Sequence, residues 1–120
     1  MATLLLVDDD RVVRETLCEV LSQTYECHTA DRAEQALEYL EVENYDVVLT
    51  DISMPGLSGR EILKRVKQHD PITPVIIITG TASEEKEEFL ERGAFAFFSK
   101  PFRLAEIEDA IVRALACQER

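Results

Sequence analysis

Five residues of this chain could act together on a phosphate group or a metal ion, and each follows or ends a short apolar run: Asp8, Asp9, Asp51, Thr79 and Lys100. Carboxylates brought together repel one another, so their charged forms need a cation nearby. Oxygen ligands favour a hard ion, which predicts Mg²⁺, with Mn²⁺ as a substitute, rather than zinc. A carboxylate beside such an ion, a hydroxyl and an ammonium group suits phosphoryl transfer. We therefore interpret Asp51 as a phosphorylatable nucleophile.

The segments that must position these residues alternate between two patterns. Short aliphatic runs without polar alternation are typical of strands covered on both faces, and segments with apolar residues at helical spacing separate them. Five strands alternating with five helices predict an α/β fold, a doubly wound parallel sheet with helices on both faces. The strands are expected at about 4–7, 26–30, 46–50, 75–78 and 94–98, and the helices at about 11–23, 33–40, 58–68, from Ser83, and 104–117.

Three local signals mark where helices begin and end. Asp10 is a plausible N-cap for the first helix, and Ser83 for the fourth. Gly93 is expected to end the fourth helix as a C-cap. That helix carries only Phe89 and Leu90 as large apolar residues, so we expect it to be the least firmly packed of the five.

Composition narrows the class of protein. A chain of 120 residues with 46% hydrophobic content fits one domain, residues 1–120. The net charge of −11, without a cluster of Lys and Arg, argues against direct nucleic-acid binding. The apolar runs are far shorter than the roughly 20 residues of a membrane span, so we expect no membrane contact and a cytoplasmic location. Three cysteines without C-x-x-C spacing predict neither a disulfide framework nor a zinc site.

Four motifs, in this order, carry a resemblance to a known family: LLLVDDD, VVLTDISMPGLSG, VIIITGT and FFSKPF. The chain resembles the receiver domain of bacterial two-component response regulators, over essentially its whole length. The resemblance implies a flavodoxin-like sheet of order 2-1-3-4-5. It also implies that Asp51 is the phosphoacceptor, that Asp8 and Asp9 hold the metal, and that Lys100 binds the phosphate.

Three further positions receive specific roles from the resemblance. The backbone carbonyl of Ser53 would join Asp51 among the metal ligands. Thr79 would be the switch hydroxyl. Phe97 matches the aromatic residue that changes between an exposed and a buried rotamer in this family.

The same resemblance implies a signalling switch rather than a turnover enzyme. Asp51 would receive a phosphoryl group from a histidine of a sensor kinase or of a phosphotransfer protein, and the domain would catalyse this transfer and a slow dephosphorylation. The response would pass through the fourth helix, fifth strand and fifth helix to an output domain or protein. A phosphorelay intermediate without its own output, and a dimer formed on phosphorylation, both stay open.

Two rival functions fit the same pattern of strands and helices less well. A flavodoxin-like electron carrier would need a Ser, Thr and Gly-rich loop after the first strand, but an acidic triplet stands there and would repel a flavin phosphate. A metal-dependent phosphohydrolase with an aspartyl intermediate typically has a second acidic residue two places after the nucleophile, where this chain has Ser53.

Overall fold

The computed structural model describes residues 1–52, 54, 56, 58–80 and 86–118. Strands and helices alternate along the chain, as the sequence predicts. The elements are β1 (Thr3–Val7), α1 (Arg11–Leu21), β2 (Glu26–Ala30), α2 (Ala33–Val42), β3 (Val47–Thr50), α3 (Gly59–His69), β4 (Val75–Thr79), α4 (Lys86–Glu91), β5 (Ala96–Ser99) and α5 (Leu104–Gln118).

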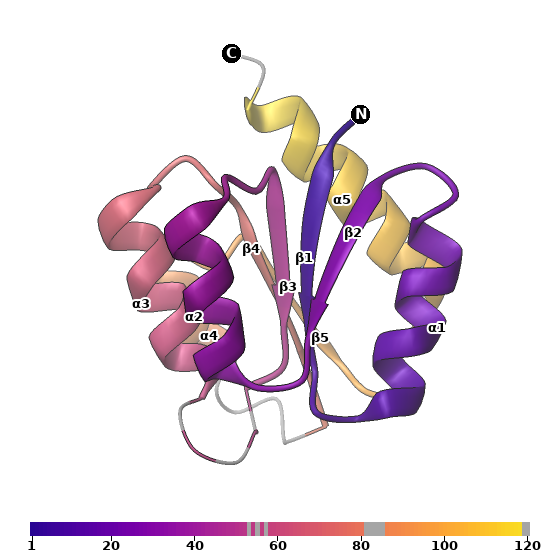
Figure 1. Cartoon of the computed structure of the whole chain (residues 1–120), viewed down its shortest axis with the longest axis horizontal. Helices are drawn as coiled ribbons and strands as arrows, with labels where there is room; N and C mark the ends of the chain where they lie inside the picture. The colour runs from indigo at the N-terminus through magenta and orange to yellow at the C-terminus, as the bar shows by residue number, and fades with distance from the viewer. Residues whose placement is uncertain (53, 55, 57, 81–85, 119–120) are drawn as a thin grey trace.

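The strands form one parallel sheet in the order β2-β1-β3-β4-β5. Helices α1 and α5 cover one face, and α2, α3 and α4 cover the other (Figure 1). The predicted doubly wound fold and its strand order are therefore confirmed. The first strand lies inside the sheet because the chain crosses to one side for β2 and to the other for β3, β4 and β5.

Two apolar cores hold the layers together, one on each face of the sheet. Side chains alternate along a strand, so within β1 Leu5 packs toward α2, α3 and α4 while Leu4 and Leu6 pack toward α1 and α5. All three leucines are at most 1% exposed. Burying each one stabilises the fold by about 1.5–3 kcal/mol, which explains why the run shows no polar alternation.

Side chains cap two of the helices that start at the carboxyl end of the sheet. Asp10 accepts hydrogen bonds from the backbone of Val12 at 2.9 Å and Val13 at 3.3 Å, which confirms it as the N-cap of α1. Ser58 and Glu61 form a reciprocal capping box at the start of α3. The cap predicted at Ser83 lies outside the described residues.

Strand β5 begins at Ala96 and not at Ala94 as predicted. The backbone N–H of Ala94 donates to the carbonyl of Phe89 at 3.0 Å, so this residue belongs to the turn that closes α4. Gly93 adopts a φ of 104°, the left-handed conformation expected of a helix-ending glycine. None of the helices in the described residues is long and apolar enough to cross a membrane.

Candidate functional site

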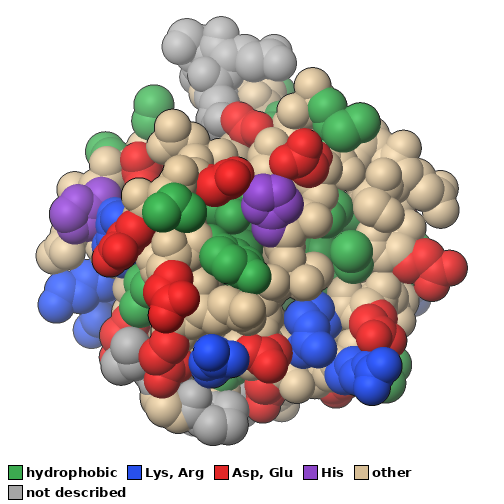
Figure 2. Space-filling model, viewed as in Figure 1, with side chains coloured by type: hydrophobic (Ala, Val, Ile, Leu, Met, Phe, Trp, Pro, Cys, Tyr) green, Lys and Arg blue, Asp and Glu red, His purple; other side chains and the backbone are tan. Residues whose placement is uncertain are grey.

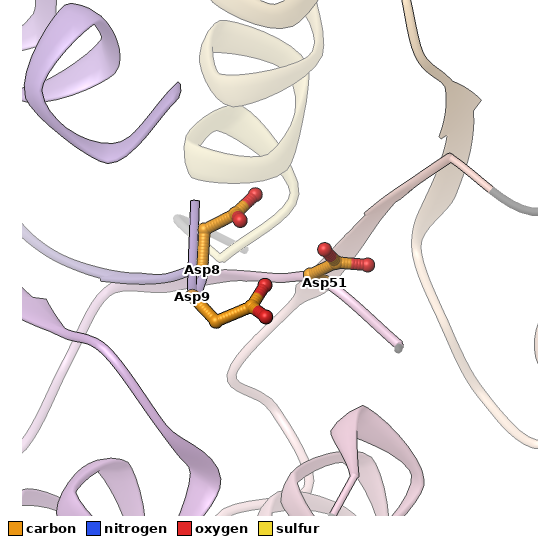
Figure 3. Close-up of side chains that lie close together, drawn as sticks. All are labelled: Asp8, Asp9 and Asp51. Atoms are coloured by element: carbon orange, nitrogen blue, oxygen red, sulfur yellow. The ribbon is translucent and has the colours of Figure 1, made fainter. Parts of the chain in front are cut away.

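Three carboxylates meet at the carboxyl end of the sheet. Strands β1 and β3 are neighbours, with Val7 opposite Thr50, so the residues that follow each strand come side by side. Carboxylate oxygens of Asp8, Asp9 and Asp51 lie within 4.8 Å of one another. Asp8 and Asp9 extend from the end of β1 toward Asp51 (Figure 3). Asp8 and Asp51 are buried, each 4% exposed, while Asp9 is exposed to solvent.

The backbone of Asp51 is fixed from two sides. Its N–H donates to the carbonyl of Val7 at 2.9 Å, which continues the pairing of β3 with β1. On the other side, the N–H of Gly59 donates to the carbonyl of Ile52 at 3.2 Å. A Cβ at Gly59 would stand only 2.3 Å from the carbonyl oxygen of Asp51, so the first turn of α3 rests directly on the backbone of this residue.

Lys100 reaches the same carboxylates from the end of β5. Its Nζ lies 2.8 Å from Oδ2 of Asp8 and 3.0 Å from Oδ2 of Asp51. The backbone N–H of Lys100 donates to the carbonyl of Thr79 at 2.7 Å, and its bond to Pro101 is cis. Its side chain is 19% exposed, so the two ion pairs are only partly screened by water.

The site has an excess of negative charge. Burial raises the pKa of the Asp8 carboxyl above its ordinary value, although hydrogen bonds from Lys100 and from the backbone of Asp10 oppose this. Burial also disfavours the charged form of Lys100, but its hydrogen bonds to Asp8 and Asp51 outweigh burial and raise the pKa of the ammonium group. One ammonium group thus partly compensates three carboxylates.

This donor set fits a magnesium ion. It offers oxygen atoms only, from two buried carboxylates and one exposed carboxylate gathered within 4.8 Å. Mg²⁺ is usually held by one or two protein carboxylates together with water and phosphate oxygens, and the exposed side of the cluster leaves room for both. The arrangement can therefore hold a hard divalent cation beside a carboxylate nucleophile.

The remaining predicted site residues have different outcomes. Thr79 ends β4 and is fully buried, opposite Ser99, the last residue of β5 and the one before Lys100. Phe97 lies apart from the carboxylates, 7% exposed, with its ring centroid 5.9 Å from that of Phe89 in α4. Ser53, the predicted carbonyl ligand, lies outside the described residues.

Two residues near the site carry contacts that the sequence did not reveal. Nη1 of Arg14 donates to the carbonyl of Asp8 at 2.8 Å and so holds the loop between β1 and α1 from one helical turn away. Gly59 leaves the space that the carbonyl of Asp51 occupies. In the sequence, Arg14 looks like a polar residue of an amphipathic helix, and Gly59 looks like an ordinary residue after a serine cap. Neither residue therefore signals its contact in advance.

Comparisons with known proteins agree with this geometry. The chain is 40% identical over 114 residues to sporulation initiation phosphotransferase F of Bacillus subtilis, which covers 93% of this chain and 92% of that protein. It is 39% identical over 117 residues to regulatory protein AtoC of Escherichia coli, covering 96% of this chain. Because that match is 25% of AtoC, the chain spans about a quarter of this relative.

Solved structures show the same likeness. The response regulator protein TrrA of Thermotoga maritima, solved in complex with Mg²⁺-BeF, superposes with a TM-score of 0.87 at 32% identity, over 96% of this chain and all of that one. The family model for the response regulator receiver domain matches residues 4–112. The motifs, the fold, the carboxylate cluster and these matches agree: the chain belongs to the response regulator receiver domain family.

Proposed function

We propose that Asp51 is the phosphoacceptor of a phosphorylation-dependent signalling switch. One observation carries the proposal: Asp51 is a buried carboxylate at a strand end, within reach of one cation and two further carboxylates. An aspartate with only a surface role would not need a cation and two further carboxylates around it. The family assignment supports the same role and disfavours the flavodoxin-like electron carrier.

The reaction would be a transfer of a phosphoryl group from a phosphohistidine of a sensor kinase or a phosphotransfer protein. An Oδ atom of Asp51 forms a bond to phosphorus while the bond from phosphorus to the imidazole nitrogen breaks, and the imidazole keeps the electron pair. Lys100, 3.0 Å from Asp51, would balance the negative charge of the transferred group. Slow hydrolysis of the acyl phosphate would reset the switch.

Asp8, Asp9 and Asp51 would hold the divalent ion, together with the backbone carbonyl of Ser53. When bound, Mg²⁺ supplies the positive charge that lets an anionic phosphoryl group approach a carboxylate. TrrA, solved with Mg²⁺-BeF, supports magnesium as the ion for this chain, whereas no comparable support exists for Mn²⁺. The chain's own contribution is to keep the three carboxylates in place before the ion arrives.

The response would begin with Lys100 and Thr79. Their strands are paired, and the N–H of Lys100 donates to the carbonyl of Thr79, so both would move when an aspartyl phosphate attracts their polar groups. Phe97 lies on β5, the strand that Lys100 follows, and its ring packs against Phe89 of α4. We propose that α4, β5 and α5 pass this change to an output partner.

The relatives support two arrangements of that output. Phosphotransferase F has nearly the length of this chain, whereas AtoC is much longer. We propose that residues 1–120 act as one receiver unit, whose output is either an attached domain or a separate protein. Dimer formation on phosphorylation stays a prediction.

The direct test is incubation of the full chain with Mg²⁺ and acetyl phosphate, followed by measurement of intact mass. The wild type should gain the mass of one phosphoryl group, in a bond that hydroxylamine or alkali cleaves. Asp51→Asn keeps the size of the side chain but lacks the nucleophilic carboxylate, so it should gain nothing.

Asp9→Asn provides a control within the cluster. It keeps Asp51 but removes one proposed metal ligand, so it should require more Mg²⁺ to reach the same extent of labelling. The assignment of Asp51 fails if the wild type gains no labile phosphate, or if Asp51→Asn gains as much as the wild type.

A further inference from the structure

A groove between α3 and α4 concentrates positive charge on an otherwise acidic molecule. Its volume is about 540 Å³, and four of the chain's thirteen basic residues line it: Arg60, Lys64, Lys67 and Arg92. In the described part of the chain, Glu61 is the one acidic residue that lines it, and its carboxylate already accepts hydrogen bonds from Ser58. On the face shown in Figure 2, one group of blue Lys and Arg side chains lies at the left edge, over α3.

The two arginines that line the groove already pair with a carboxylate from their own chain. Glu88 of α4 forms ion pairs with Arg60 and with Arg92, the latter at 3.6 Å. The side chains of all three are between 36% and 62% exposed, so a carboxylate from outside can reach the same arginines. Exposed pairs of this kind are worth roughly 0.2–1 kcal/mol each, which a competing carboxylate can replace.

The floor of the groove argues against a small ligand. Phe89 is fully buried, and the guanidinium of Arg60 covers its ring at 4.8 Å from the centroid. Leu63 is only 2% exposed. Small-molecule sites are lined predominantly by apolar and aromatic side chains, whereas the two apolar residues of this groove are covered and its other lining residues are polar or charged. A peptide, by contrast, can lie along the groove and use the alkyl chains of Lys64 and Lys67 as apolar contacts.

We propose that the groove between α3 and α4 is a docking surface for an acidic segment of a partner protein. Arg60, Lys64 and Arg92 would pair with Asp or Glu side chains of the segment, which would compete with Glu88 for the two arginines. The ammonium group of Lys67 already donates to the carbonyls of Pro71 at 3.2 Å and Thr73 at 3.3 Å. The net charge of −11 would repel a partner that is acidic throughout. Since screening limits repulsion to about 8 Å at physiological ionic strength, an acidic segment on a neutral or basic partner avoids this penalty.

The test uses the unphosphorylated full chain, so that its result does not depend on the role of Asp51. The probe is a fluorescein-labelled peptide of about 12 residues with two leucines three residues apart among glutamates, and the matched probe carries lysines instead. Fluorescence anisotropy at physiological ionic strength should show saturable binding of the acidic peptide, with a Kd below about 1 mM, and markedly weaker binding of the basic one.

Variants on opposite sides of the molecule locate the binding. The double variant Lys64→Glu with Arg92→Glu should weaken binding at least about tenfold, whereas Arg113→Glu, with a charge reversal on α5, should change it by less than about twofold. Glu88→Gln removes the internal competitor without removing a basic residue, so it should tighten binding by about threefold. Circular dichroism spectra check that each variant is folded.

Three outcomes would overturn the proposal. The first is no saturable binding of the acidic peptide up to about 1 mM. The second is equal binding of the basic peptide. The third is a double variant that binds as tightly as the wild type, which would place the peptide elsewhere. Lys64 is exposed, so Lys64→Glu alone should fold. If the double variant unfolds, the binding measurement is made on this single variant instead.

Discussion

Replacing Gly59 by alanine tests whether α3 holds the backbone of Asp51 in place. The new Cβ would lie 2.3 Å from the carbonyl oxygen of Asp51 and 3.1 Å from Cα of Ile52, and both are backbone atoms that cannot rotate away. Forcing an extra methyl group into a packed site costs about 1–3 kcal/mol, and the higher helix propensity of alanine returns at most about 1 kcal/mol. We expect a net loss of about 1–2 kcal/mol, which lowers Tm by roughly 4–8 °C for a domain of this size.

Thermal unfolding followed by circular dichroism measures this loss, and Gly80→Ala is the matched control. Among the described residues, a Cβ at Gly80 meets no atom closer than the Cδ of Lys100 at 4.0 Å, so the stability of this variant should stay within about 0.5 kcal/mol of the wild type. Because the clash displaces Asp51, labelling by acetyl phosphate should also slow in Gly59→Ala, by about tenfold to a hundredfold. A Gly59→Ala variant with wild-type Tm and labelling rate would refute the reasoning.

Three further predictions concern the site and its supports. Asp8→Asn should raise Tm in metal-free buffer at neutral pH. Burial raises the pKa of Asp8 in the folded state, so the stabilising contribution of this carboxyl exists at low pH and is lost as pH rises through that pKa. The Tm of the variant should therefore decrease less than that of the wild type between acidic and neutral pH. Lys100→Met should still take up phosphate, slowly, but lose the change in backbone NMR shifts that phosphorylation causes in α4 and β5. Ser58→Ala removes the capping box with Glu61 and should cost about 1 kcal/mol in urea unfolding, while an unchanged midpoint would mean that the cap is not stabilising.

The sequence predicted the fold well because its strongest signals are local. The run from Leu4 to Val7 is covered on both faces, so all of its residues are apolar and the run stands out in the sequence as a buried strand. Helix ends were predicted less well, since α1 stops at Leu21 rather than near residue 23. There the last carbonyls accept hydrogen bonds from Ser22, Gln23 and Thr24 in a tightening turn, a geometry that composition does not specify.

The carboxylate cluster could be predicted because it depends only on topology. In a parallel sheet the residues after neighbouring strands must meet, so topology alone predicts that Asp8, Asp9 and Asp51 lie together, as their carboxylates do. The supports of the cluster could not be predicted in this way. The contact of Arg14 with the carbonyl of Asp8 and the space left by Gly59 arise from helix orientation, which no residue type reports by itself.

The contact between Phe89 and Phe97, at 5.9 Å between ring centroids, joins the groove to the strand that leads to Lys100. Thermodynamic linkage is symmetric. If the position of Phe97 changes on phosphorylation, as the family resemblance implies, any preference of a docked segment for one position of Phe97 then has an equal counterpart in the equilibrium between the phosphorylated and unphosphorylated forms. A protein that occupies the groove would then act as an effector of phosphorylation as well as an output partner. How long a signal lasts would depend partly on what is bound to α3 and α4, not only on the chemistry at Asp51.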